Sequence, residues 1–142
     1  MKLKQVAALP VKRTKKGKIR ILLVTSRETR RWVVPKGWPM DGKKPWRAAE
    51  IEAMEEAGAE GEIAKSRIGT FDYHKRFDNG DRRKCRVSLF PLHVENLRRK
   101  YRERDQRTRK WFSPRAAARV VDEKDLKKLF RSLRKDPEIL SL

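Results

Sequence analysis

The sequence has a single cysteine, Cys85, among its 142 residues. One thiol excludes an intrachain disulfide and a zinc site built from cysteines. Apolar residues come in short runs, and none approaches the ~18 residues that a membrane-spanning helix needs. Residues 1–11 are too short and too interrupted to form a secretory signal peptide. These absences predict a cytoplasmic protein that does not enter a membrane.

Acidic residues are scarce relative to basic ones. Nineteen Asp and Glu stand against thirty-nine Lys and Arg, which gives a formal net charge of +20 at pH 7. Such an excess attracts polyanions, whether nucleic acid, an anionic membrane surface or a small molecule rich in phosphates. The composition does not choose among these partners, and a solvated basic surface accounts for part of the excess.

The order of extended and helical patterns predicts one mixed α/β domain over residues 1–142. Pro45 and Gly58 bracket an Ala- and Glu-rich helix, and Asn79-Gly80 is a hairpin turn signal. Asp122 stands where it can cap a last helix, whose apolar residues at helical spacing indicate ordinary core packing. We expect strands at 4–13, 19–25, 32–35, 62–75, 83–94 and 110–113, and helices at 46–57 and 122–135.

The scarce acidic residues concentrate in one segment. Residues 48–64 hold six glutamates and no lysine or arginine. Glu52, Glu55 and Glu56 are spaced i, i+3, i+4, so their carboxylates share one face of a helix although they repel one another. Carboxylates suit Mg²⁺, which takes oxygen ligands from the protein and from substrate phosphates. The pattern indicates a divalent-cation site; the alternative is a solvated helix face.

The segment around these glutamates resembles a Nudix box, G-x5-E-x7-R-E-U-x-E-E-x-G-U, where U is aliphatic. Gly37 and residues 51–59 match its spacing. Residues 32–37 and 111–114 resemble further Nudix segments, and the similarity extends over about residues 6–133. The order of the segments is most similar to the diadenosine and diphosphoinositol polyphosphate phosphohydrolase group. The resemblance implies a Nudix-type α/β/α sandwich with a central mixed β-sheet.

Two positions depart from the box. Lys43 replaces its first glutamate and Ile51 replaces its arginine, which in the family helps to hold the metal-binding carboxylates in place. The three carboxylates that the resemblance assigns to the metal are retained. Two alternatives stay open: other residues orient these carboxylates, or the site is weakened.

The resemblance implies a Mg²⁺- or Mn²⁺-dependent hydrolase that cleaves a phosphoanhydride in a nucleoside-diphosphate-linked, dinucleoside polyphosphate or diphosphoinositol substrate. Glu52, Glu55, Glu56 and the carbonyl of Gly37 would bind the metal. Glu55 or Glu56 would remove a proton from the attacking water. Further candidates for this base are Glu103 and Asp105, and the candidates for binding substrate phosphates are Arg27, Arg109, Lys18 and Arg76.

A competing motif overlaps the start of the box. Residues 37–44 nearly match the P-loop pattern G-x-x-x-x-G-K-[ST]. Lys44, however, stands where the hydroxyl that binds Mg²⁺ is needed, and Pro39 removes an N–H group from a loop that should wrap phosphate. We therefore favour the Nudix interpretation over an NTPase.

The alternative from another class is a catalytically weak Nudix-fold module that binds RNA or nucleotides. Lys43, Ile51 and the net charge favour it. RNA-binding surfaces usually combine basic residues with aromatic ones for stacking, and Tyr101 is the only aromatic residue within the basic segment 97–110. A small polyphosphate is therefore the expected partner, ahead of nucleic acid.

Overall fold

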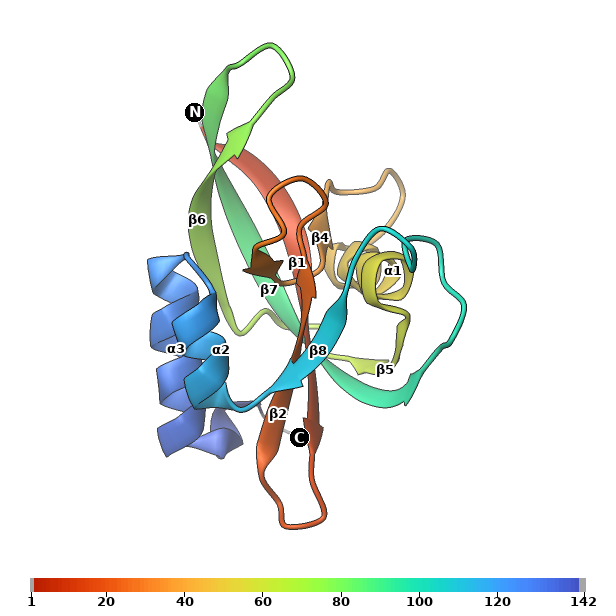
Figure 1. Ribbon diagram of the computed structural model, residues 1–142, viewed down its shortest axis with the longest axis vertical. Coiled ribbons are helices and arrows are strands. Elements are labelled where there is room, and N and C mark those ends of the chain that lie inside the picture. The colour runs from red at the N-terminus through yellow and green to blue at the C-terminus, as the bar shows by residue number, and fades with distance from the viewer. Residues whose placement is uncertain (1, 141–142) are drawn as a thin grey trace.

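The computed structural model describes residues 2–140, which form one eight-stranded sheet flanked by helices (Figure 1). The helices are α1 (Pro45–Ala57), α2 (Pro114–Val120) and α3 (Lys124–Lys135), followed by a 3-10 turn over Pro137–Leu140. The strands are β1 (Leu3–Arg13), β2 (Ile19–Thr25), β3 (Trp32–Val33), β4 (Lys36–Gly37), β5 (Ala59–Ile63), β6 (Gly69–Arg76), β7 (Arg82–Leu97) and β8 (Arg109–Phe112).

The sheet is mixed, as the sequence predicts. Its main path runs β3-β2-β1-β7-β5, with β4 paired to β1, β6 to β7 and β8 to β2. β1 and β7 are parallel, and the other pairs are antiparallel. β1 lies at the centre, and its pairing with β4 fixes the start of the loop that leads into α1.

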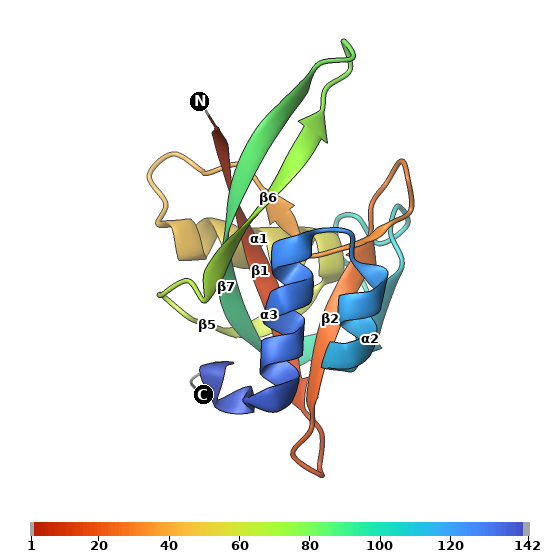
Figure 2. The same cartoon turned by 90° about the vertical axis from the view of Figure 1, so that its left-hand side faces the viewer.

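Helices cover both faces of the sheet, with α1 on one and α2 and α3 on the other (Figure 2). Because side chains alternate along a strand, both faces of β1 are buried: Val6 and Ala8 pack toward α1, and Leu9 and Val11 toward α3. This arrangement confirms the expected α/β/α sandwich. Within residues 2–140, no helix is long and apolar enough to cross a membrane.

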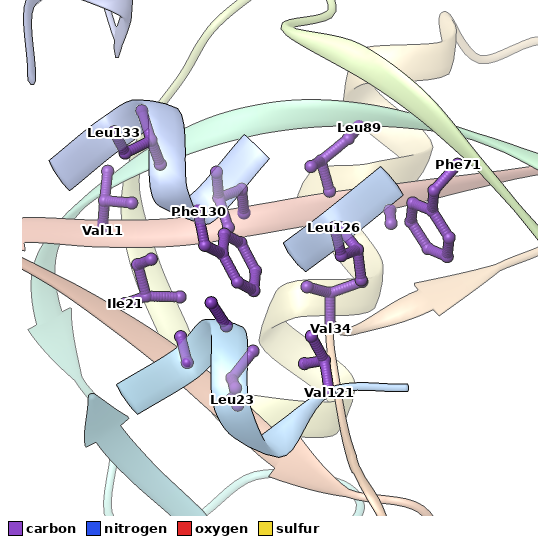
Figure 3. Close-up of a cluster of buried hydrophobic side chains, with 14 of the residues drawn as sticks. Val11, Ile21, Leu23, Val34, Phe71, Leu89, Val121, Leu126, Phe130 and Leu133 are labelled. Carbon is purple, nitrogen blue, oxygen red and sulfur yellow. The ribbon is translucent and has the colours of Figure 1, made fainter. Parts of the chain in front are cut away.

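The two faces are packed differently. α1 presents small side chains that let it approach the sheet closely, namely Ala48, Ala49, Ala53 and Ala57. On the other face, Leu126, Phe130 and Leu133 of α3 insert large side chains among those of β1 and β2 (Figure 3). The close approach of α1 brings the acidic segment against the sheet.

Several expected elements differ from those observed. The expected strand 62–75 is two strands, because β5 ends at Ile63 and β6 begins at Gly69. α2 was not expected. Asp122 does not cap α3: the capping position is Glu123, without a side-chain capping bond, and the carboxylate of Asp122 instead accepts a hydrogen bond of 3.0 Å from Arg31.

Candidate active site

The structure seats one carboxylate directly against the backbone of β4. Gly37 pairs with Val6 of β1, and a Cβ built on it would lie 2.5 and 2.6 Å from the two carboxylate oxygens of Glu52. Real Cβ atoms essentially never come within 3.0 Å of such neighbours. A glycine at this position therefore leaves the space that the Glu52 carboxylate occupies.

Glu56, one turn further along α1, is the most buried of the three box carboxylates, with 7% of its side chain exposed. Its Oε1 accepts a long hydrogen bond of 3.4 Å from the backbone N–H of Lys36. Its Oε2 lies 3.8 Å from Nη2 of Arg107. Both oxygens are thus oriented by groups from outside α1.

Glu52 and Glu56 form an acidic pair in which each carboxyl group affects the pKa of the other. Burial, and then the negative charge of Glu56, raise the pKa of Glu52 to about 8. Burial also raises the pKa of Glu56, although Arg107 and Lys36 oppose that change. At neutral pH without a cation, the pair therefore holds a proton that two separate carboxylates would release.

Glu55 points elsewhere. Its Oε1 forms an ion pair of 3.3 Å with the exposed Arg102, and its backbone carbonyl accepts a hydrogen bond of 2.9 Å from the N–H of Glu103. The ion pair is at the surface, where such contacts contribute about 0–1 kcal/mol. Rotation of the Glu55 side chain toward the other two carboxylates therefore costs little.

The loop between β7 and β8, residues 98–108 and here called the basic loop, adds a fourth carboxylate. Oε1 of Glu103 accepts a hydrogen bond of 2.9 Å from Nε of Arg107, and the charge of Glu103 contributes to the raised pKa of Glu52 and of Glu56. Asp105, the other additional candidate for the base, is exposed on the same loop. Of the two, the structure brings Glu103 to the acidic pair.

These carboxylates suit Mg²⁺ or Mn²⁺ by their chemistry, since both ions prefer oxygen donors. A partly buried pair that holds an extra proton is an arrangement that a divalent cation stabilises, because the cation replaces that proton. Within residues 2–140, no three acidic, histidine or cysteine side chains are already gathered closely enough to hold an ion. Glu52 and Glu56 thus form a preformed pair, and a third carboxylate would have to rotate to reach them.

Arg27 and Arg109, two candidates for phosphate binding, have different surroundings. Arg27 is 60% exposed, with its Nε 3.9 Å from Oε1 of Glu103, so it stands at the rim of the carboxylate group. Arg109 donates a hydrogen bond of 2.8 Å to the carbonyl of Ala57, and its guanidinium lies 4.7 Å from the ring centroid of Tyr101. Arg109 therefore closes the end of α1, and its phosphate-binding role stays a prediction.

Lys18 and Arg76, the other two candidates, belong to the β1–β2 and β6–β7 hairpins, which extend toward opposite ends of the molecule (Figure 1). Gly37 pairs with Val6 of β1, whereas Lys18 lies beyond the end of that strand at Arg13, roughly 20 Å further on at ~3.3 Å per residue. Arg76 is the last residue of β6, at the outer part of its hairpin. The structure does not bring either side chain to the carboxylates.

Two residues at the site were not among the candidates. Lys36 is half-buried, with Nζ 5.0 Å from the ring centroid of Tyr73, and the loss of hydration there lowers its pKa. Arg107 lies between Glu56 and Glu103. The sequence offers one indication of Arg107, its position four residues after Glu103. This spacing does not distinguish Arg107 from the many other arginines of the basic loop.

A model of the NUDIX domain family matches residues 1–133 of the chain. Nudix hydrolase 13, mitochondrial, of Arabidopsis thaliana is 27% identical over 106 residues, which are 71% of this chain and 52% of that protein. Nudix hydrolase 12, mitochondrial, of the same plant is 28% identical over 104 residues, or 51% of its length. The chain thus spans about half the length of these two curated relatives.

Solved structures share the fold. An Ap4A hydrolase of C. elegans superposes with a TM-score of 0.69 at 22% identity, over 95% of this chain and 98% of that one. The NUDIX domain of Shewanella oneidensis NrtR, complexed with ADP ribose, gives a TM-score of 0.67 at 13% identity, over 95% and 88%. With the α/β/α sandwich, the acidic box on α1 and the family match over residues 1–133, the chain belongs to the Nudix family.

Proposed function

We propose that the protein is a divalent-metal-dependent pyrophosphohydrolase that cleaves a phosphoanhydride in a nucleoside-diphosphate-linked, dinucleoside polyphosphate or diphosphoinositol substrate. The observation that carries this proposal is the acidic pair of the half-buried Glu52 and the buried Glu56, in which Glu52 lies against Gly37 and Glu103 is near enough to affect both pKa values. The name hydrolase among the curated relatives, and an Ap4A hydrolase among the similar structures, support the same reaction class.

Glu52, Glu55 and Glu56, with the carbonyl of Gly37, are the proposed ligands of Mg²⁺ or Mn²⁺. The bound ion would neutralise phosphate charge and lower the pKa of a bound water. Glu55 or Glu56 is the proposed general base, and Glu103 is a third candidate because Arg107 holds it beside the pair. Arg27, exposed at the rim next to Glu103, is the proposed ligand for substrate phosphate.

The position of Glu52 also argues against a nucleotide site of the P-loop type. In such a loop, the backbone from the first glycine onward wraps a phosphate group. Here Gly37 lies against the carboxylate of Glu52. The carboxyl group of Glu52 thus occupies the space beside the first glycine, where a P-loop would hold its phosphate. The loop before α1 therefore positions carboxylates and does not wrap a phosphate.

A panel of dinucleoside polyphosphates, nucleoside diphosphate derivatives and diphosphoinositols, each with Mg²⁺ or Mn²⁺ and with product analysis, tests the proposal. We expect turnover of at least one class that depends on the ion and stops with a chelator. No turnover of any class, together with tight RNA binding, would instead support the RNA- or nucleotide-binding module that the +20 charge favours. The cytoplasmic location stays a prediction that fractionation can test.

A further inference from the structure

One buried guanidinium connects three parts of the site. Arg107, with 10% of its side chain exposed, donates a 2.9 Å hydrogen bond from Nε to Glu103 and a 3.0 Å hydrogen bond from Nη1 to the carbonyl of Thr25. Its Nη2 lies 3.8 Å from Oε2 of Glu56. Every nitrogen of the planar fork thus faces a specific acceptor, which a lysine ammonium cannot reproduce with the same geometry.

The backbone around Arg107 is fixed as firmly as its side chain. The N–H of Thr25 donates to the carbonyl of Thr108 at 2.9 Å, and the N–H of Thr108 donates to Oγ1 of Thr25 at 2.9 Å. These bonds attach the end of the basic loop to the last residue of β2. Arg107 therefore projects from an anchored backbone, which makes it a suitable reference point for the two carboxylates.

The helix that carries Glu56 does not supply an equivalent cation. Arg47, the only Lys or Arg in α1, pairs with Glu50 at 2.6 Å, and position 51 is an isoleucine. Within residues 2–140, the ion pairs made by Glu55 and Glu56 both come from the basic loop, through Arg102 and Arg107 respectively. The Arg102 pair is at the surface, whereas the Arg107 pair is buried and is screened less by salt.

We propose that Arg107 is the positioning residue of the carboxylate site, holding Glu56 and Glu103 side by side where both would be available to a divalent cation. This inference rests on the proposed function, which gives the two carboxylates their role in binding a metal ion. It gives the basic loop a specific structural role, and it identifies a residue that acts on the reaction through other residues.

The first test compares Arg107→Gln and Arg107→Lys with Arg104→Gln, which removes an exposed arginine of the same loop. Mn²⁺ binding is measured on the metal-free protein without substrate, by calorimetry or by the resonance of free Mn²⁺. Loss of an outer partner of a metal ligand typically weakens metal affinity or activity 10- to 100-fold. We expect a loss in this range for Arg107→Gln, a smaller loss for Arg107→Lys and less than a twofold change for Arg104→Gln.

A double-mutant cycle separates positioning from general destabilisation. If Arg107 acts through Glu56, then Arg107→Gln in a Glu56→Gln background should weaken Mn²⁺ binding less than threefold further. Thermal unfolding without metal reports the folded state of each variant. Additive losses in the cycle, or unchanged Mn²⁺ affinity in a folded Arg107→Gln protein, would overturn the inference.

Kinetics and hydrogen exchange distinguish this inference from the proposed function. For an active enzyme at saturating metal, Arg107→Gln should lower kcat about 10- to 100-fold and change KM less than threefold. If the parent neither binds Mn²⁺ nor turns over substrate, the proposed function fails. The amide of Lys36, which donates to Glu56, then still tests the positioning: it should exchange faster in Arg107→Gln but not in Arg104→Gln, and equal exchange contradicts the inference.

Discussion

The carboxylate of Glu52 lies against the backbone of Gly37, so a methyl group added there would meet Oε1 at 2.5 Å. Gly37→Ala should therefore displace Glu52 from the acidic pair and lower kcat at least tenfold. The loss of stability should be small, because the atoms that must move are the far end of the flexible Glu52 side chain. The measurements are kcat on the best substrate and the free energy of unfolding in urea.

Gly69 offers the matched control for this substitution. It begins β6, and nothing lies within 4 Å of a Cβ built on it. Gly69→Ala should leave both kcat and the free energy of unfolding nearly unchanged. If the two alanine variants behave alike, the close approach of Glu52 to Gly37 does not matter for the site.

The acidic pair predicts that the metal-free protein loses stability as the pH rises. Burial raises the pKa of Glu52 from its ordinary 4.5 to about 8, so between these values the folded state binds a proton that the unfolded state releases. This contribution to stability is fully present below pH 4.5 and is lost as the pH rises through 8. Thermal midpoints of parent and Glu52→Gln, measured without metal between pH 5 and 9, should diverge as the pH rises toward 8, with the parent falling below the variant, because the amide of Gln stays neutral.

Other shifted groups act in different pH ranges. Burial lowers the pKa of His93 below 6.5, so the contribution of the neutral imidazole to the free energy of unfolding is lost as the pH falls below that value. Arg86 holds the pKa of Asp72 at about 2, so the contribution of Asp72 to stability is lost only at still lower pH.

Mn²⁺ affinity should rise with pH up to about 8, because Mn²⁺ binding displaces the proton shared by Glu52 and Glu56. An affinity independent of pH over this range would contradict the acidic pair as the metal site.

Glutamate-to-glutamine variants distinguish the roles of the carboxylates. Glu56→Gln should abolish most turnover, since loss of a general base alone costs about 10²- to 10⁴-fold. Without metal the variant should be as stable as the parent or slightly more so, because like charges on α1 repel. Glu55→Gln and Glu103→Gln, compared by the pH dependence of kcat, show which carboxylate takes the proton.

Glu50→Gln is the control for this series. Glu50 is on the same helix but pairs with Arg47, away from the acidic pair. Its substitution should change kcat less than twofold. Equal activity in Glu56→Gln and the parent would remove the carboxylate cluster from the mechanism.

Local patterns predicted much of this fold. The β-branched run at Ile19–Thr25 is strand β2 with the expected bounds, and Gly58 ends α1 with a φ of 62°, as its sequence position suggests. The missed helix α2 had a local signal too, since Ser113 caps it by accepting a hydrogen bond from the N–H of Ala116 and Pro114 is its first residue. The prediction that Asp122 caps α3 is wrong because its carboxylate pairs with Arg31, which is distant in the sequence. No local pattern indicates that partner.

The candidate site also contains residues that local sequence predicts and residues that only tertiary contacts bring together. Helical spacing alone brings Glu52, Glu55 and Glu56 to one face, so the sequence predicts that group. The contacts of Arg107 with Glu56 and Thr25 join residues that are 51 and 82 positions apart. No local pattern distinguishes such a residue from its basic neighbours, and only the folded chain does.

Arg27 tests whether the basic surface serves a small polyphosphate or a nucleic acid. A compact substrate contacts a few cations near the carboxylates. The fall in kcat/KM for Arg27→Ala should therefore correspond to a loss of about 1–3 kcal/mol of transition-state stabilisation, the value of one charged hydrogen bond. Arg131 and Arg134 line a pocket between α2 and α3, on the opposite face of the sheet from α1. Alanine at either position should leave kcat/KM nearly unchanged.

A nucleic-acid partner predicts another pattern for the same variants. Its contacts spread over many phosphates, and each neutralised phosphate releases counterion, so affinity falls steeply with salt. RNA affinity from low to moderate salt, measured beside kcat/KM for all four single alanine variants at Arg27, Arg109, Arg131 and Arg134, separates the two cases. Arg109→Ala should also lower the thermal midpoint, because the guanidinium bonds to the carbonyl of Ala57. If the remote variants weaken RNA binding as much as Arg27→Ala weakens hydrolysis, and no small substrate turns over, the binding module is correct and the hydrolase is not.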